Sequence, residues 1–177
     1  QLPGPGTIES LGGIAAGDVN QDGLPDLVVP SRRGRDRVNL WLHPKNLPPN
    51  KPGTVSGLAP LGNALANGLA CALGDFDNDD IPDLFIVGAG TNALLRGKGD
   101  GTFEDVTRAS GIGSAGALSR SALFLDADHD ADLDIFVCNS GFPDGRPAPN
   151  ELWNNNGDGT FTNIALRAGV ACADSRS

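Results

Sequence analysis

The chain has 177 residues, a formal net charge of −9 and neither Tyr nor Met, but it contains 25 Gly and 13 Pro residues. This length can bury a sizeable hydrophobic core, and the abundance of Gly and Pro favours many short strands and tight turns over long helices. The acidic balance and the absence of a basic stripe argue against nucleic-acid binding, and no apolar run in the sequence is long enough to cross a bilayer as a helix.

Three repeats of roughly 50 residues organise the sequence, which is a spacing typical of β-propeller blades. We predict an irregular segment at residues 1–11, repeats at residues 12–66, 67–117 and 118–172, and a tail at residues 173–177. Each repeat is expected to contain four strands, A to D. Strand A is a run of mainly small residues at 13–17, 69–73 and 121–125. Strand B is a β-branched and aromatic run, typical of a buried strand, at 26–30, 83–88 and 134–138.

An aspartate-rich loop joins strand A to strand B in each repeat. The loops begin at Asp18, Asp75 and Asp126, and side chains that carry oxygen recur at loop positions 1, 3, 5 and 9. Such side chains in a tight loop point toward a common centre, which suits Ca²⁺ better than Mg²⁺ because Mg²⁺ demands a stricter octahedron. The predicted metal ligands, which include position 7, are Asp18, Asn20, Asp22, Leu24, Asp26, Asp75, Asp77, Asp79, Ile81, Asp83, Asp126, Asp128, Asp130, Asp132 and Asp134.

Calcium is therefore the expected cofactor, with one ion in each of the three loops. Without a cation, the carboxylates of one loop would repel one another at short range, where salt screens poorly. An EF-hand is excluded because it needs a bidentate Glu at position 12, which is Val29, Ile86 or Val137 here. The alternative is three solvated acidic turns, since Asp and Gly favour turns. Three ions of charge +2 would change the formal charge from −9 to −3.

Strands C and D complete each repeat. Strand C opens with an asparagine, namely Asn39, Asn92 and Asn150, and strand D begins at Phe103 and Phe161 after matching Asp-Gly hairpins. In the first repeat, the proline-rich stretch from residue 43 to residue 60 replaces the hairpin, and we expect it to be extended and poor in hydrogen bonds. Trp41 and Trp153 occupy matching positions in strand C, which favours packing between blades. A four-stranded meander places the A-to-B loops and the C-to-D turns at one end, and the B-to-C loops at the other.

Residues 17–27, their two copies, and residues 154–161 resemble the FG-GAP/VCBS repeat superfamily, which includes the calcium-loop blades of integrin α-subunit heads and, in particular, cartilage acidic protein-like repeat proteins. The resemblance extends from about residue 12 to residue 172. It implies an all-β fold of three four-stranded antiparallel propeller-blade-like repeats, with calcium between strands A and B and a role in adhesion or scaffolding.

The sequence departs from this family pattern at two loop positions and in the number of blades. Position 6, usually Gly, is Asp80 in the second loop and Ala131 in the third, and position 3 of the first loop is Asn20. Closed propellers use about four to eight blades, whereas this chain supplies three. A fragment, an open array and contacts from neighbouring chains are the alternatives, and unpaired edges in an open array would favour self-association.

We predict a secreted calcium-binding β-repeat protein with a structural or adhesive role, which associates with itself or with another extracellular protein or glycan. The alternative is a recognition module, or a non-catalytic fragment of a larger secreted protein, that binds through the variable B-to-C loops. Its candidate ligand-binding residues are Arg32, Arg33, Arg35 and Arg37. The simpler interpretation of these arginines is a solvated basic loop.

No enzymatic activity is expected. His43 lies in the proline-rich stretch, His129 should point outward from the third loop, and no nucleophile–base motif is present. Metal binding explains the paired carboxylates better than glycosidase chemistry does.

An extracellular location is expected because calcium modules of modest affinity operate at near-millimolar calcium. The chain starts at Gln1 without a visible signal peptide, which suits a processed terminus or an excised fragment. Cys71 and Cys138 lie in apolar strands and are expected to be buried free thiols. Cys172 could pair with either of them or with another chain.

Overall fold

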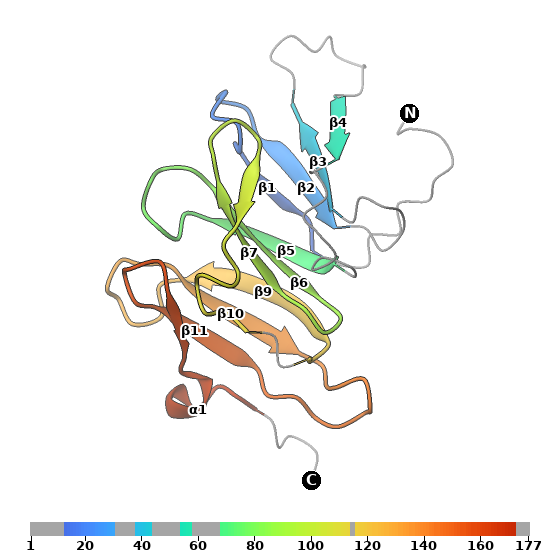
Figure 1. Ribbon diagram of the computed structural model, residues 1–177, viewed down its shortest axis with the longest axis vertical. Helices are drawn as coiled ribbons and strands as arrows, with labels where there is room; N and C mark the ends of the chain where they lie inside the picture. The colour runs from blue at the N-terminus through green and yellow to red at the C-terminus, as the bar shows by residue number, and fades with distance from the viewer. Residues whose placement is uncertain (1–12, 31–37, 44–53, 58–67, 114–115, 173–177) are drawn as a thin grey trace.

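The computed structural model describes residues 13–30, 38–43, 54–57, 68–113 and 116–172. These residues form three four-stranded antiparallel sheets and one short helix, α1 (Ala165–Ala168), so the fold is all-β (Figure 1). We call the sheets blades 1, 2 and 3. Blade 1 contains β1 (Ala15–Gly17), β2 (Asp26–Pro30), β3 (Val38–Leu42) and β4 (Thr54–Gly57). Blade 2 contains β5 (Gly68–Gly74), β6 (Asp83–Gly88), β7 (Ala93–Gly97) and β8 (Phe103–Asp105). Blade 3 contains β9 (Ser119–Leu125), β10 (Asp134–Asn139), β11 (Glu151–Asn155) and β12 (Phe161–Asn163).

The strands lie in sequence order within each blade, as predicted from the repeat pattern. The Asp-Gly hairpins are also confirmed: Lys98 N donates to Thr102 O (3.1 Å) and Asn156 N donates to Thr160 O (3.0 Å). Gly101 and Gly159 follow the aspartates with φ of 81°, a conformation that favours glycine. The periodic and turn signals in the sequence therefore predicted the blades because these signals are local.

Two predictions about blade 1 were wrong. Residues 54–57 were expected to be poor in hydrogen bonds, but they form β4, which pairs with β3. No proline interrupts this segment, so its amides are available for the sheet ladder. The second wrong prediction is that strand C opens with Asn39, because Asn39 is the second residue of β3. It pairs with Val29, and the equivalent pair in blade 3 is Glu151 with Val137. It therefore lies one position later than Asn150, which directly precedes β11.

The blades stack side by side in an open series. The first strands of the blades are neighbours, with β5 between β1 and β9 (Figure 1). The described residues do not close into a propeller ring. Blade 2 consequently has a neighbouring blade on both faces. This explains why every residue of β6 is buried, because a strand covered on both faces is a continuous apolar run.

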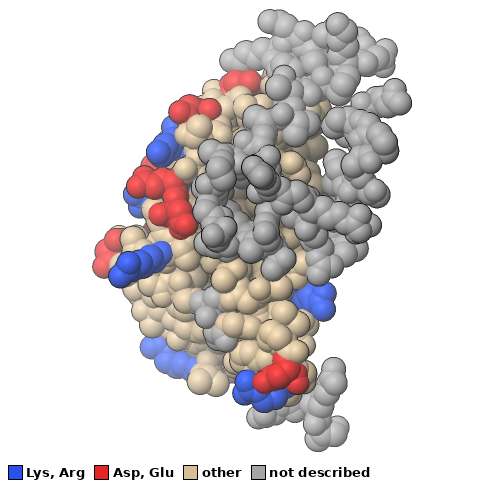
Figure 2. Space-filling model, turned by 45° about the vertical axis from the view of Figure 1, so that its right-hand side comes forward, with Lys and Arg blue, Asp and Glu red and all other residues tan. Residues whose placement is uncertain are grey.

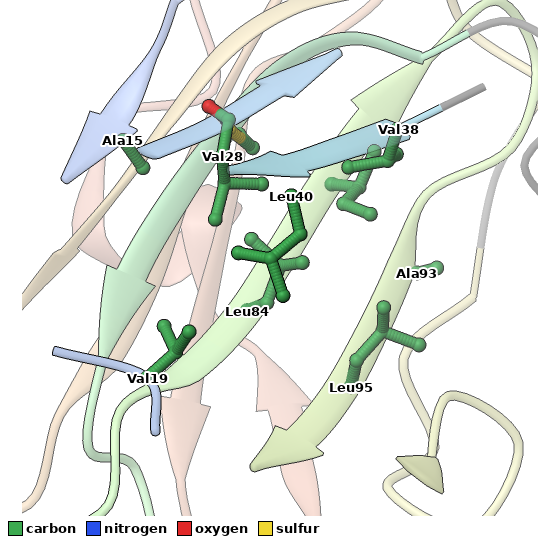
Figure 3. Close-up of a cluster of buried hydrophobic side chains, with 10 residues drawn as sticks. Ala15, Val19, Val28, Val38, Leu40, Leu84, Ala93 and Leu95 are labelled. Carbon is green, nitrogen blue, oxygen red and sulfur yellow. The ribbon is translucent and has the colours of Figure 1, made fainter. Parts of the chain in front are cut away.

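Two hydrophobic clusters hold the blades together. Between blades 1 and 2, Val28 and Leu40 pack against Leu84 and Leu95 (Figure 3). The cluster between blades 2 and 3 comprises Ala70, Phe76, Phe85, Val87, Leu94, Ile112, Ile135, Val137, Trp153 and Phe161. Burial of a side chain such as Leu84 contributes about 1.5–3 kcal/mol relative to exposure. These clusters fix the relative positions of the loops at the blade ends.

The tryptophans occupy matching registers, since Trp41 pairs with Leu27 and Trp153 pairs with Ile135. The prediction of packing between blades is confirmed for Trp153, which is buried between blades 2 and 3. Trp41 is only half-buried, and its ring makes an edge contact with the ring of His43 (centroids 6.2 Å apart).

All three cysteines are free thiols. Cys71 is buried, and its Sγ lies 3.4 Å from Val28 O. Burial raises the pKa of this thiol to about 12. The prediction of a buried free thiol is therefore confirmed for Cys71, whereas Cys138 is only half-buried and Cys172 is exposed without a disulfide partner.

Candidate metal loops

The three A-to-B loops adopt one geometry, in which the position 1 carboxylate organises the turn. In the first loop, Asp18 accepts hydrogen bonds from the amides of Asp22 (2.9 Å) and Gly23 (2.7 Å). In the second, Asp75 accepts from the amides of Asp79 (3.1 Å) and Asp80 (2.8 Å). The third loop, at 126–134, differs slightly because the position 4 amide takes the place of the position 5 amide (2.7 Å). Such side-chain-to-backbone bonds are what Asp supplies in turns.

The position 9 carboxylates are fully buried, at 0% exposure for Asp26, Asp83 and Asp134. Each accepts one hydrogen bond from the position 2 amide (3.2, 2.9 and 3.0 Å) and one from the amide at the end of strand C (2.7, 2.8 and 2.8 Å). Burial raises the pKa of Asp83 to about 7, against the lowering effect of its two amide donors. This residue therefore ties the loop to the third strand as well as being a candidate ligand.

Carboxylate oxygens converge in the second and third loops. Asp75, Asp77 and Asp83 place one oxygen each within 4.8 Å of one another, as do the three acids at positions 1, 3 and 5 of the third loop. Burial raises the pKa of Asp77, and the charges of Asp79 and Asp75 raise it further, against the lowering effect of the neighbouring Arg96. The pKa values of Asp77 and Asp83 in the second loop are thus both raised. A bound cation would lower them, because it favours the charged carboxylates.

The donor set fits a divalent cation. Hard oxygen ligands in a flexible loop are what Ca²⁺ takes. Oδ1 of Asp77 is buried and has no hydrogen-bond partner within the described residues, so an acceptor is available at position 3. The first loop carries the amide of Asn20 there, and its Nδ2 lies 3.4 Å from Asp22 Oδ2. Asp132, at position 7, donates its amide to Asp130 Oδ1 (2.9 Å), and the amides of Leu24 and Ile81 make the same contact in their loops.

Left-handed backbone recurs at positions 4 and 6. At position 6, φ is 86° for Gly23, 65° for Asp80 and 77° for Ala131, so the conformation that the sequence motif predicts is present without glycine in two loops. Position 4 is also left-handed in all three loops, including Asn78 (φ 58°) and His129 (φ 66°). His129 is exposed, as expected from its loop position. Gln21 (φ 53°) and Ala131 are of residue types that seldom adopt this conformation, which indicates that the loop geometry outweighs local preference.

The first and second loops are each hydrogen-bonded to the following blade, a feature that the sequence did not predict. Val19 O accepts from Gly101 N of blade 2 (3.1 Å), and Phe76 O accepts from Asn155 Nδ2 of blade 3 (2.8 Å). Position 4 also reaches the next loop: Asn78 Nδ2 donates to Asp132 Oδ1 (2.7 Å). These contacts confirm that the loops and the C-to-D hairpins share one end. They could not be inferred from spacing because they depend on how blades stack.

Charged side chains gather near the loops. On the face shown in Figure 2, most acidic side chains lie along one edge, where Lys and Arg side chains are interspersed. A polar cavity of about 220 Å³ lies between the second loop and the hairpin of blade 3, and Arg96 and Asp158 both line it. Nε of Arg96 lies 2.8 Å from Oδ2 of Asp77. A cation of the protein itself is thus already present beside the second loop.

The opposite end of the blades contains a buried acid that the sequence did not single out. Glu151 is 5% exposed, accepts a hydrogen bond from Trp153 Nε1 (2.9 Å) and contacts Asn139 Nδ2 (3.4 Å). Burial raises its pKa. The sequence could have indicated this buried acid, because Glu151 stands at the start of a strand that is otherwise mostly buried. At this end, the predicted ligand-binding residues Arg32, Arg33, Arg35 and Arg37 lie outside the described residues.

The family comparison agrees with this architecture. A model of the FG-GAP-like repeat matches residues 18–86 and, in an overlapping second match, residues 75–137. No curated protein matches the chain. None of the helical structure in the described part of the chain has the length and hydropathy of a membrane span. Together the two matches extend from residue 18, at the start of the first loop, to residue 137, inside β10. They cover more than half of the chain, which therefore belongs to the FG-GAP-like repeat family.

Proposed function

We propose that this chain is an extracellular calcium-binding β-repeat module with a structural or adhesive role and no enzymatic activity. FG-GAP-like repeats are typical of extracellular proteins. The observation that carries the proposal is the convergence of three carboxylate oxygens in the second loop, where buried Asp77 Oδ1 has no hydrogen-bond partner among the described residues. An oxygen-rich, partly buried site of this kind needs a compensating positive charge.

The residues at positions 1, 3, 5, 7 and 9 would hold one ion in each loop. Bound calcium supplies positive charge that offsets the repulsion among the carboxylates. Asp75 and Asp83 also hold the loop backbone through amide hydrogen bonds, so fixing their carboxylates fixes the turn. Because Phe76 O in this loop accepts from Asn155 of blade 3, a fixed turn also stabilises the packing of blade 2 on blade 3.

Thermal unfolding with and without calcium tests this proposal. A site whose free calcium exceeds its dissociation constant 100-fold adds about 2.7 kcal/mol to the free energy of unfolding, which is a rise in Tm of roughly 5–10 °C for a chain of this size. Magnesium at the same concentration should give a smaller rise, because it loses its water ligands reluctantly. An unchanged Tm in saturating chelator would exclude calcium as a structural component.

A matched pair of variants separates the loops from general acidity. Asp128→Asn alters an exposed acid at position 3 of the third loop, and should reduce the gain in Tm that calcium gives. Asp144→Asn alters an exposed acid that pairs with Arg146 Nε (2.7 Å) outside the loops, and should leave that gain unchanged. Equal effects of the two variants would indicate nonspecific screening of acidic charge.

Association with another protein, including a second copy of the chain, is the second part of the proposal. Blade 3 supports it, because Leu123 is 46% exposed on β9 and Leu166 is 86% exposed on α1. Burial of these side chains would favour association. Light scattering should then show oligomers in calcium that are lost in Leu166→Ser, whereas a monomer at all concentrations would exclude self-association and leave a different partner.

A further inference from the structure

Arg96 is a feature of blade 2 alone. In each blade, a residue at the end of the third strand donates its amide to the position 9 carboxylate. These residues are His43 (2.7 Å), Gly97 (2.8 Å) and Asn155 (2.8 Å). The residue before each of these amides is Leu42 in blade 1, Arg96 in blade 2 and Asn154 in blade 3. Only blade 2 therefore places a cationic side chain at this position beside its acidic loop.

The pairing of Arg96 with the loop is electrostatic and incomplete. Nε lies 2.8 Å from Asp77 Oδ2, and the guanidinium carbon lies 5.8 Å from the centre of the Phe76 ring. Within the described residues, however, Nε makes no hydrogen bond and Asp77 Oδ1 has no partner. The two side chains are 40% and 21% exposed. Such a partly solvated pair is weak, so a divalent ion can displace it.

We propose that Arg96 is a built-in competitor for the cation at the second loop and weakens that site relative to a blade without it. The inference rests on the proposed calcium binding. A guanidinium at Asp77 repels a divalent ion that needs the same carboxylate, and the repulsion is larger in the partly buried loop than in water. Calcium bound at the available Oδ1 of Asp77 would therefore repel Arg96 from Oδ2 of the same carboxylate.

The surroundings allow Arg96 to move away without losing a carboxylate partner. It lines the polar cavity of about 220 Å³ whose other wall carries Asp132 and Asp158 of blade 3. Its guanidinium already points toward the hairpin of blade 3. Nη2 of Arg96 lies close to Gly159 of that hairpin, since a Cβ at Gly159 would be 3.8 Å from it. Displacement by calcium would transfer the positive charge toward blade 3. Occupancy of the second loop is thus coupled to the contact between blades 2 and 3.

A calcium titration followed by amide NMR tests the proposal on the full chain. The position 6 amides of Gly23, Asp80 and Ala131 each contact the position 1 carboxylate of their loop (2.7, 2.8 and 3.3 Å), so each reports one loop. In Arg96→Leu, which installs the residue of blade 1, the dissociation constant reported by Asp80 should fall about fivefold. The value reported by Gly23 in the first loop, which is remote from this cavity, should not change.

Two further variants keep the test specific. Arg96→Lys retains the charge and should leave the second-loop dissociation constant within about twofold of the native value. Arg120→Leu removes a positive charge on β9, where Nε donates to Ser140 Oγ (3.0 Å) at the other end of the blade, and should change no loop. An unchanged Asp80 response in Arg96→Leu, or the same change in Arg96→Lys, overturns the inference. A chain in which no loop amide responds to calcium instead overturns the proposed function.

Discussion

Replacement of Ala131 by Gly should stabilise the protein, although glycine usually destabilises. Ala131 has φ of 77° at position 6 of the third loop, where a residue with a Cβ carries a strain of about 1–2 kcal/mol. Glycine removes this strain but costs about 0.4–1 kcal/mol through the larger entropy of the unfolded chain. The net gain is about 0.5–1 kcal/mol, which is a rise in Tm of roughly 1–4 °C.

Ala127→Gly is the matched control, because Ala127 is an exposed alanine of the same loop without a positive φ. This change brings only the entropic cost, so it should lower the Tm by a few degrees. Thermal unfolding of both variants in chelator measures the backbone effect without any contribution from a bound ion. A lower Tm for Ala131→Gly would refute the conclusion that loop geometry imposes a strained conformation on position 6.

Three other predictions concern the interior of the blades. Asn155→Ala removes the side-chain donor to Phe76 O, leaves a buried carbonyl unpaired and should lower the free energy of unfolding in urea by about 1–3 kcal/mol; a loss below 0.5 kcal/mol would contradict this. Because the folded-state pKa of Glu151 is raised, its contribution to stability is full below the unfolded-state pKa of about 4.3 and is lost as pH rises through the folded-state pKa. The free energy of unfolding of Glu151→Gln, measured in urea, should therefore rise relative to that of the native chain between pH 4 and pH 8. A difference between the two chains that does not depend on pH would refute the shift in pKa. With a thiol reagent in native buffer, Cys172 should react quickly and Cys71 only after unfolding; rapid reaction of Cys71 would contradict its burial.

The loops were predictable from sequence because their determinants are local. Asp18, Asp75 and Asp126 recur with the same following pattern, and each bonds amides within five residues of itself. The order of strands within a blade followed for the same reason, since alternating apolar runs and Asp-Gly turns act over short distances. The metal ligand set remains a prediction built on this local geometry.

Features that join different blades were not predictable in this way. The hydrogen bond from Asn155 to Phe76 O spans 79 residues, and nothing in the spacing of either residue indicates it. The asparagine at the start of strand C was misleading in blade 1, because Asn39 occupies the register of Glu151 rather than that of Asn150. Register depends on pairing with strand B, which a pattern in one strand does not fix.

A crystal structure of the chain grown in calcium would test calcium binding in the loops most directly. We expect one ion in each loop, bound by side-chain oxygens of positions 1, 3 and 5 at about 2.3–2.6 Å. In the second loop, Arg96 Nε should have moved away from Asp77, from which it lies 2.8 Å without an ion. Loops that retain their amide hydrogen bonds but hold only water at saturating calcium would show that the three acidic loops are structural turns and not calcium sites.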